Sequence, residues 1–349
     1  MSNETSTDAT DLRRNGFVVR KEQAYAALIA GCGVLTILVT VGIVLSLSGR
    51  AVAFWTEVPP VEFFTGTNWS PIVSQSYGVL PLVSGTLIVT VCSAAIALPV
   101  GLAAAIYLSE YASERARSIL KPALEILAGV PTVIYGYMAL VYVTPLVDAV
   151  LPINLTVIGS RTRLLSLPEW LPVGSGFVLA VPEFTFVMPS LRTFNVLSAS
   201  IVVGIMIIPM VSSISEDALS AVPDSLREAA YGLGSTKYDV STKVVVPAAT
   251  SGIVASYVLA ISRAIGETMA VTMAMGMSPQ MPFFPNVLRN LAESSQTMTA
   301  AIVQIAGADQ TPGATYEAMF AIGMTLFGMT LVMNVLAELV RRRFQEAYD

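Results

Sequence analysis

The sequence contains no histidine, only two cysteines and few charged residues. Without histidine it lacks a common metal ligand and the side chain that titrates near neutral pH. Cys32 and Cys92 both lie inside apolar runs, so they indicate neither a disulfide framework nor a zinc site. No pairing of a nucleophile with a base is found either, and together these absences argue against a membrane enzyme.

Apolar residues dominate instead. Of the 349 residues 54% are hydrophobic and 12% are charged, and the mean hydropathy is +0.70. Such a composition is typical of a polytopic membrane protein, in which each span needs ~20 apolar residues to cross a hydrocarbon core ~30 Å thick. We therefore predict an all-α membrane protein with six transmembrane helices. The predicted spans are residues 24–47, 79–108, 122–146, 196–214, 251–276 and 314–340.

The basic residues predict the orientation of these spans. Thirteen of the 19 lie in the two tails and in the loops on the same side of the membrane, five lie on the other side, and Arg263 lies within a span. Because basic loops stay in the cytoplasm, we expect a multi-pass cell-membrane protein whose tails, 1–23 and 341–349, are both cytoplasmic. Residues 48–78 and an insertion at 147–195 would then be external.

The cytoplasmic loop at 215–250 carries an ordered pattern of turn signals. Pro223 is suited to the start of a short helix, and Gly234 permits a sharp turn. Thr236-x-x-Asp239 then fits a capping box that starts a second helix, and Pro247 precedes the next apolar run. The pattern predicts a helix–turn–helix at the membrane surface, and an ordinary amphipathic hairpin would share it.

The spacing of this segment, Glu-Ala-Ala at 228–230, Gly234 and Val244-x-Val246-Pro247, resembles the EAA loop of ABC importer permeases. The resemblance implies that the loop docks on an ATP-hydrolysing subunit and transmits its motion. The residues to which it assigns this coupling role are Glu228, Ala229, Ala230, Gly234, Thr236, Lys237, Tyr238 and Pro247.

Two opposite charges lie near the middle of the fifth predicted span. Insertion of an ionised side chain at that depth of the membrane costs ~2.5–3.5 kcal/mol. Arg263 and Glu267 are therefore expected to have a structural or functional role. In a continuous helix their i, i+4 spacing puts them on one face. They form either a self-neutralising ion pair or, together with Thr268, part of a substrate pathway. A guanidinium group suits a tetrahedral oxyanion because it donates two parallel hydrogen bonds.

Three further stretches sharpen the resemblance. Residues 63–87, 123–136 and 263–276 are similar to the C-type permease of phosphate-specific transport complexes. The resemblance implies a type I, MetI-like ABC permease domain over 79–340, forming half of a phosphate translocation pathway. It also implies an A-type permease partner, two ATP-binding subunits and an external phosphate-binding protein, in contact with membrane lipid and without nucleic acid.

Several alternatives stay open at this point. The chain could be the sister A-type permease or a permease for another tetrahedral oxyanion, such as sulfate or molybdate. An ion-coupled secondary carrier would need no ATPase, but it would tend to show inverted repeats and broken midplane helices. The sequence has no G-x-x-x-x-G-K-[ST] phosphate loop, so we expect ATP to be bound by partner subunits, with no cofactor or metal on this chain.

Overall fold

The computed structural model describes residues 16–150, 191–283, 287–308 and 313–345, almost all of them helical. The first half contains α1 (Gly16–Glu57), α2 (Pro60–Thr65), β1 (Trp69–Ser70), β2 (Ser76–Tyr77), α3 (Leu80–Ile106), the π-helix η1 (Tyr107–Tyr111), α4 (Glu114–Ala128), α5 (Thr132–Met138), the π-helix η2 (Ala139–Val143) and α6 (Thr144–Val150). The second half contains α7 (Val196–Ser220), α8 (Asp224–Gly232), α9 (Lys237–Val240), the π-helix η3 (Ser241–Val245), α10 (Val246–Ala248), α11 (Thr250–Gly266), α12 (Met269–Met275), α13 (Val287–Ala292), α14 (Met298–Gly307) and α15 (Ala314–Gln345).

The number of membrane-spanning helices agrees with the prediction. Among the described residues five helical stretches are long and apolar enough to cross a bilayer. A sixth is obtained if the segment 237–248 and α11, which meet at 71°, count as one bent span. The five are Arg20–Glu57, Leu80–Tyr111, Thr132–Ala149, Val196–Ser220 and Ala314–Leu339. The all-α membrane architecture is therefore confirmed.

The third predicted span, 122–146, is wrong at its start. The chain breaks at Gly129–Pro131 and separates α4 from α5, so the apolar stretch begins only at Thr132. Proline lacks an N–H and disfavours the helical conformation of the residue before it, which explains the break. The 15-residue α4 is amphipathic and has no buried residue, so it lies outside the bundle core.

The fifth predicted span, 251–276, is also interrupted. α11 ends at Gly266, Glu267 is extended with φ −66° and ψ 133°, and α12 begins at Met269. Residues 277–313, between the fifth and sixth predicted spans, contain the apolar helix α14, which is too short for a full span. The expected external loop at 48–78 holds α2 and the antiparallel β1–β2 pair. Most of the expected insertion at 147–195, and the ends of both tails, lie outside the described residues.

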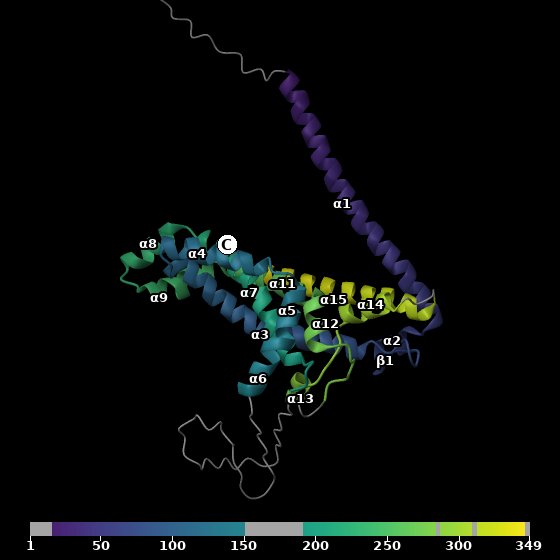
Figure 1. Cartoon of the computed structure of the whole chain (residues 1–349). Coiled ribbons are helices and arrows are strands. Elements are labelled where there is room, and N and C mark those ends of the chain that lie inside the picture. The colour runs from purple at the N-terminus through teal and green to yellow at the C-terminus, as the bar shows by residue number, and fades with distance from the viewer. Residues whose placement is uncertain (1–15, 151–190, 284–286, 309–312, 346–349) are drawn as a thin grey trace, which may run out of the picture.

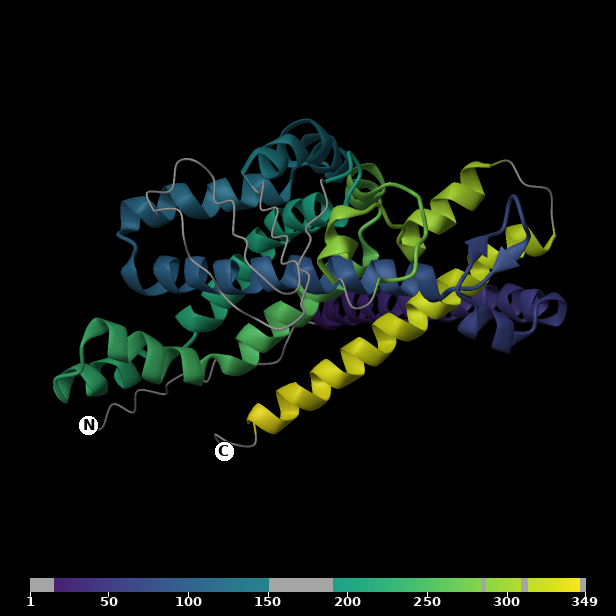
Figure 2. The same cartoon turned by 90° about the horizontal axis from the view of Figure 1, so that it is seen from below.

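Two long helices form the centre of the bundle. α3 runs its whole length, from the β1–β2 end to the α8–α9 end (Figure 2), and packs on α7. Glycine permits this close approach: a Cβ on Gly101 would lie 2.6 Å from Cβ of Val211. Small residues commonly bring membrane helices together in this way. Figure 1 shows α8 and α9 at one end of the bundle and α2 with β1 at the other, with the N-terminal part of α1 standing away from it.

Candidate functional site

The helix–turn–helix between α7 and α11 forms as its sequence predicts. α8 follows Pro223, with Asp224 in its first turn, where a negative charge is favourable. Gly234 has φ +83°, a conformation that strains other residues. Thr236 caps α9: its hydroxyl oxygen accepts from the main-chain N–H of Asp239 at 3.2 Å and donates to the Asp239 carboxylate at 2.6 Å.

One face of this helix–turn–helix is exposed, and the other packs against the helix bundle. Of the predicted coupling residues, Ala230 is buried in an apolar cluster with Leu219 and Val245, and Pro247 is half-buried. The remaining six are exposed: Glu228, Ala229, Gly234, Thr236, Lys237 and Tyr238. Large apolar side chains are exposed beside them, including Leu233 at 88% and Tyr238 at 67%. An exposed apolar tip of this kind is typical of a protein contact surface.

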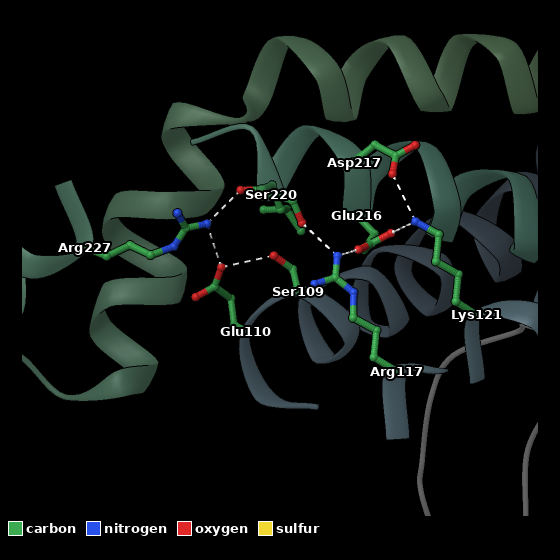
Figure 3. A network of polar contacts seen from close by, with 9 residues as sticks. Ser109, Glu110, Arg117, Lys121, Glu216, Asp217, Ser220 and Arg227 are labelled. Atoms are coloured by element: carbon green, nitrogen blue, oxygen red, sulfur yellow. Dashed lines mark hydrogen bonds and ion pairs between the residues drawn. The ribbon is translucent and has the colours of Figure 1, made fainter. Parts of the chain in front are cut away.

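The packed face is fixed by charged contacts that the sequence did not reveal. Arg227 lies on α8 and forms an ion pair with Glu110 of η1, at 3.1 Å (Figure 3). The ammonium group of Lys237 lies 5.0 Å from the ring centre of Tyr111, which is also in η1. Both short helices of the turn are thus attached to the end of α3. Neither pair was predicted, because the partners are more than 100 residues apart.

A second charged cluster holds α4 to α7. Glu216 is fully buried near the end of α7 and accepts from both Arg117 and Lys121 of α4 (Figure 3). Lys121 also lies 3.2 Å from Asp217. The hydrogen bond to Glu216, stronger than the opposing effect of burial, raises the pKa of Lys121 above its usual value. A buried carboxylate with two cationic partners is stable where an isolated one would not be.

The helix break brings the predicted pathway residues into a different arrangement. Glu267 is buried, and its side-chain Oε1 accepts from the main-chain N–H of Ala270 at 3.2 Å, so that it caps α12. Its carbonyl oxygen accepts from the hydroxyl of Thr299 at 2.8 Å. Thr268 is half-buried, and its hydroxyl donates to the carbonyl of Gly266 at 3.2 Å. These contacts satisfy main-chain groups that lipid would leave unpaired.

Arg263 and Glu267 do not form the ion pair that was one of the two interpretations. Their shared helix face required a continuous helix, and the chain is extended at Glu267. Arg263 is exposed, forms no hydrogen bond or ion pair within the part of the chain that is described, and interacts electrostatically with Tyr135 of α5. It lies thirteen positions after Thr250, the first residue of α11, or ~20 Å along the helix. Its guanidinium group is therefore available to bind an anion.

Within the described ranges no three side chains of the types His, Cys, Asp and Glu come together as metal ligands would. The two sites are an exposed, partly apolar surface at the α8–α9 end and the unpaired cation Arg263 on α11.

Comparison with known proteins identifies relatives among ABC transporter permeases. The profile of the family described as "Binding-protein-dependent transport system inner membrane component" matches residues 97–346. The chain is 30% identical over 319 residues to "Probable ABC transporter permease protein YqgH" of Bacillus subtilis, covering 90% of this chain and 89% of that protein. It is 32% identical over 289 residues to "Phosphate transport system permease protein PstC" of Xylella fastidiosa, covering 82% and 80%.

Solved structures agree on the fold. A chain of the bacterial alginate ABC transporter, in complex with an alginate pentasaccharide-bound periplasmic protein, matches with a TM-score of 0.54 and 15% identity, over 94% of this chain and 96% of that chain. At that identity the likeness concerns the fold alone, and it confirms the predicted ABC permease fold. The chain belongs to the family of binding-protein-dependent transport system inner membrane components.

Proposed function

We propose that this chain is a transmembrane permease subunit of an ATP-driven phosphate importer and forms half of its translocation pathway. Relatives that bear the name of phosphate transport permeases share about a third of its residues over four fifths of their length, which supports the choice of phosphate. The chain itself binds the anion and moves it, and hydrolyses nothing.

The observation that carries this proposal is the exposed, unpaired guanidinium group of Arg263 on an apolar helix. A charge in a membrane faces water or protein, because exposure to lipid is unfavourable. The face of α11 that bears Arg263 therefore lines the pathway, opposite the second permease. Phosphate would displace water there and accept two parallel hydrogen bonds from the guanidinium fork.

Glu267 and Thr268 belong to the same pathway in this proposal. The Glu267 carboxylate would repel a dianion, but the break that it caps brings main-chain groups of Gly266 and Thr268 close to the path. Broken helices line substrate sites in secondary transporters as well. The break therefore supports a substrate pathway, whereas the choice of an ATP-driven importer rests on the family of the chain.

The partners and the orientation follow from the same reasoning. The α8–α9 end lies in the cytoplasm with both tails, where the exposed residues among 228–238 bind one of two ATP-binding subunits. An A-type permease supplies the other half of the pathway, and an external binding protein delivers phosphate. ATP is bound by the partner subunits, with no cofactor or metal on this chain.

The test is uptake of radiolabelled phosphate by proteoliposomes that contain the complete complex. We expect ATP-dependent uptake by the wild type, loss of at least about tenfold in Arg263→Gln, and smaller loss in Arg263→Lys, which keeps the charge without the planar fork. Sulfate and molybdate serve as competitors. Uptake that is driven by an ion gradient without ATP would favour a secondary carrier, and normal uptake by Arg263→Gln would remove Arg263 from the pathway.

A further inference from the structure

We propose that Arg227 is a positioning residue that makes α8, the end of α7 and the end of α3 move as one unit. The inference rests on the proposed function, in which an ATP-binding subunit acts on α8. The loop joins α7 and α11 directly along the chain, and the proposal adds α3 as a third helix on which α8 acts. Nothing in the spacing of the loop residues assigns this role to Arg227, which lies one position before the coupling motif.

The contacts of one guanidinium group carry the proposal. Nη2 of Arg227 donates to the carbonyl oxygen of Leu219, in the last turn of α7, at 2.8 Å, and Nη1 donates to the carbonyl oxygen of Val222 at 2.5 Å. Nη2 also lies 3.1 Å from Oε1 of Glu110 in η1. The Leu219 carbonyl is one of the groups at the C-terminus of α7 that have no partner four residues later in the helix. One side chain thus joins three segments (Figure 3).

Burial makes these contacts strong enough to transmit a displacement. The side chain of Arg227 is 15% exposed and that of Glu110 is 5% exposed. A charge pair that is shielded from water is weakened little by salt, and removal of one partner leaves the other buried without compensation. By contrast, the pair that Arg227 makes with Asp224 on its own helix involves a carboxylate that is 89% exposed. The contact with Glu110 is therefore the one that resists separation.

The position of Arg227 relative to the contact surface supports the same role. α8 has nine residues, and a helix of this length does not hold its direction without tertiary contacts. Glu228 is exposed on α8, whereas Arg227 is partly buried and directed at the bundle. A force on the exposed face of α8 is thus passed to α3 and α7 through Arg227.

α3 extends this connection to the helix break. At its far end the hydroxyl of Thr86 accepts from the main-chain N–H of Met298 at 3.1 Å. The next residue, Thr299, donates to the carbonyl of Glu267. α3 therefore links the α8–α9 end to the interruption in the fifth span by direct contacts, in addition to the route through α11.

The experiment measures how many ATP molecules are hydrolysed per phosphate transported, in proteoliposomes that contain the complete complex. We expect Arg227→Gln and Glu110→Gln each to raise this ratio at least about fivefold, with ATPase subunits still bound. If the two residues act through each other, the double variant has no larger effect than the stronger single variant. Arg115→Gln is the matched control, because Arg115 is an exposed arginine at the same end whose side chain has no hydrogen bond or ion pair in the described structure.

An unchanged ratio in both single variants would overturn the proposal. So would effects that multiply in the double variant, because the two side chains would then act independently. A merely structural role would lower the amount of assembled complex and leave the ratio of ATP to phosphate unaltered.

A second readout does not depend on the identity of the substrate. Spin labels on Ser225→Cys of α8 and Tyr107→Cys of η1, in a chain with Cys32→Ser and Cys92→Ser, report the distance between the two elements. We expect this distance to stay constant between the nucleotide-free and ATP-bound complexes, and to change on ATP binding once Arg227→Gln is added. A distance that changes equally in both proteins would refute the coupled movement. Absence of phosphate uptake by the wild type would instead refute only the proposed substrate.

Discussion

Thr299 donates a hydrogen bond from its hydroxyl to the main-chain carbonyl oxygen of Glu267, with 2.8 Å between the two oxygens. The helix break deprives this carbonyl of the partner that a continuous helix would supply four residues later. Glu267 is buried, so water does not replace that partner. The segment that ends at Thr299, in the first turn of α14, therefore stabilises the interruption of the fifth span.

Replacement of Thr299 by valine keeps the shape of the side chain and removes the donor. We expect Thr299→Val to destabilise the protein by about 1–3 kcal/mol, the cost of an unpaired buried polar group, and to reduce phosphate uptake. The measurement is the loss of the monodisperse peak in size-exclusion chromatography after heating in detergent, together with uptake by the reconstituted complex. Thr299→Ser retains the hydroxyl and is the control. Equal behaviour of the valine and serine variants would show that the hydrogen bond is unimportant.

Gly85 marks a second close approach to the same segment. A Cβ atom at this position would overlap the main-chain carbonyl oxygen of Gln296 and lie 2.8 Å from the hydroxyl oxygen of Ser295. We expect Gly85→Ala to force α3 away and to destabilise the protein by about 1–3 kcal/mol, as overpacking does. Gly31→Ala is the matched control, because nothing lies within 4 Å of a Cβ there. Thermal stability in detergent compares the two, and an equally stable Gly85→Ala would contradict the close packing.

The contacts of Glu216 with α4 lead to two predictions, one on a substitution and one on pH. We expect Glu216→Gln to loosen α4, so that trypsin cleaves the chain faster after Arg117. The exposed Glu114 of the same end provides the control Glu114→Gln. Because the pKa of Lys121 is raised in the folded protein, its ion pair contributes fully below the ordinary value of 10.5 and is lost as pH rises through the raised value. Protection from trypsin that is identical in the wild type and Glu216→Gln would exclude this role.

The long apolar runs and the turn residues were sufficient to predict much of this molecule. Apolar runs of nineteen or more residues predicted α3, α7 and α15, and the four residues from Thr236 to Asp239 predicted the cap of α9. These features depend on neighbours along the chain. The prediction that Arg263 and Glu267 share a helix face was wrong, because the helix breaks at Glu267. That break is stabilised by Thr299, 32 residues away.

The buried ion pairs could not be predicted for the same reason, because each joins residues that are distant in the sequence. The spacing of Arg117, Lys121 and Arg227 resembles that of any basic loop, so these residues indicate only the orientation of the chain. Their partners Glu216 and Glu110 lie 95 to 117 residues away. The sequence offered one hint, the acidic residues at the end of the apolar run of α7, but not which cations would meet them.

The exposed coupling residues lead to the last prediction. Glu228 is exposed on α8 and has no hydrogen bond or ion pair within the described segments, so its substitution leaves the fold intact. We expect Glu228→Lys to keep the protein in the membrane with unchanged thermal stability, but to reduce co-purification of the ATP-binding subunit at least about tenfold, because a reversed charge in a contact surface is repelled. Glu114→Lys, a reversal at another exposed site of the same end, is expected to leave co-purification unchanged. Should Glu228→Lys retain the subunit and transport phosphate at the wild-type rate, the exposed face of α8 is not the surface on which the ATP-binding subunit acts.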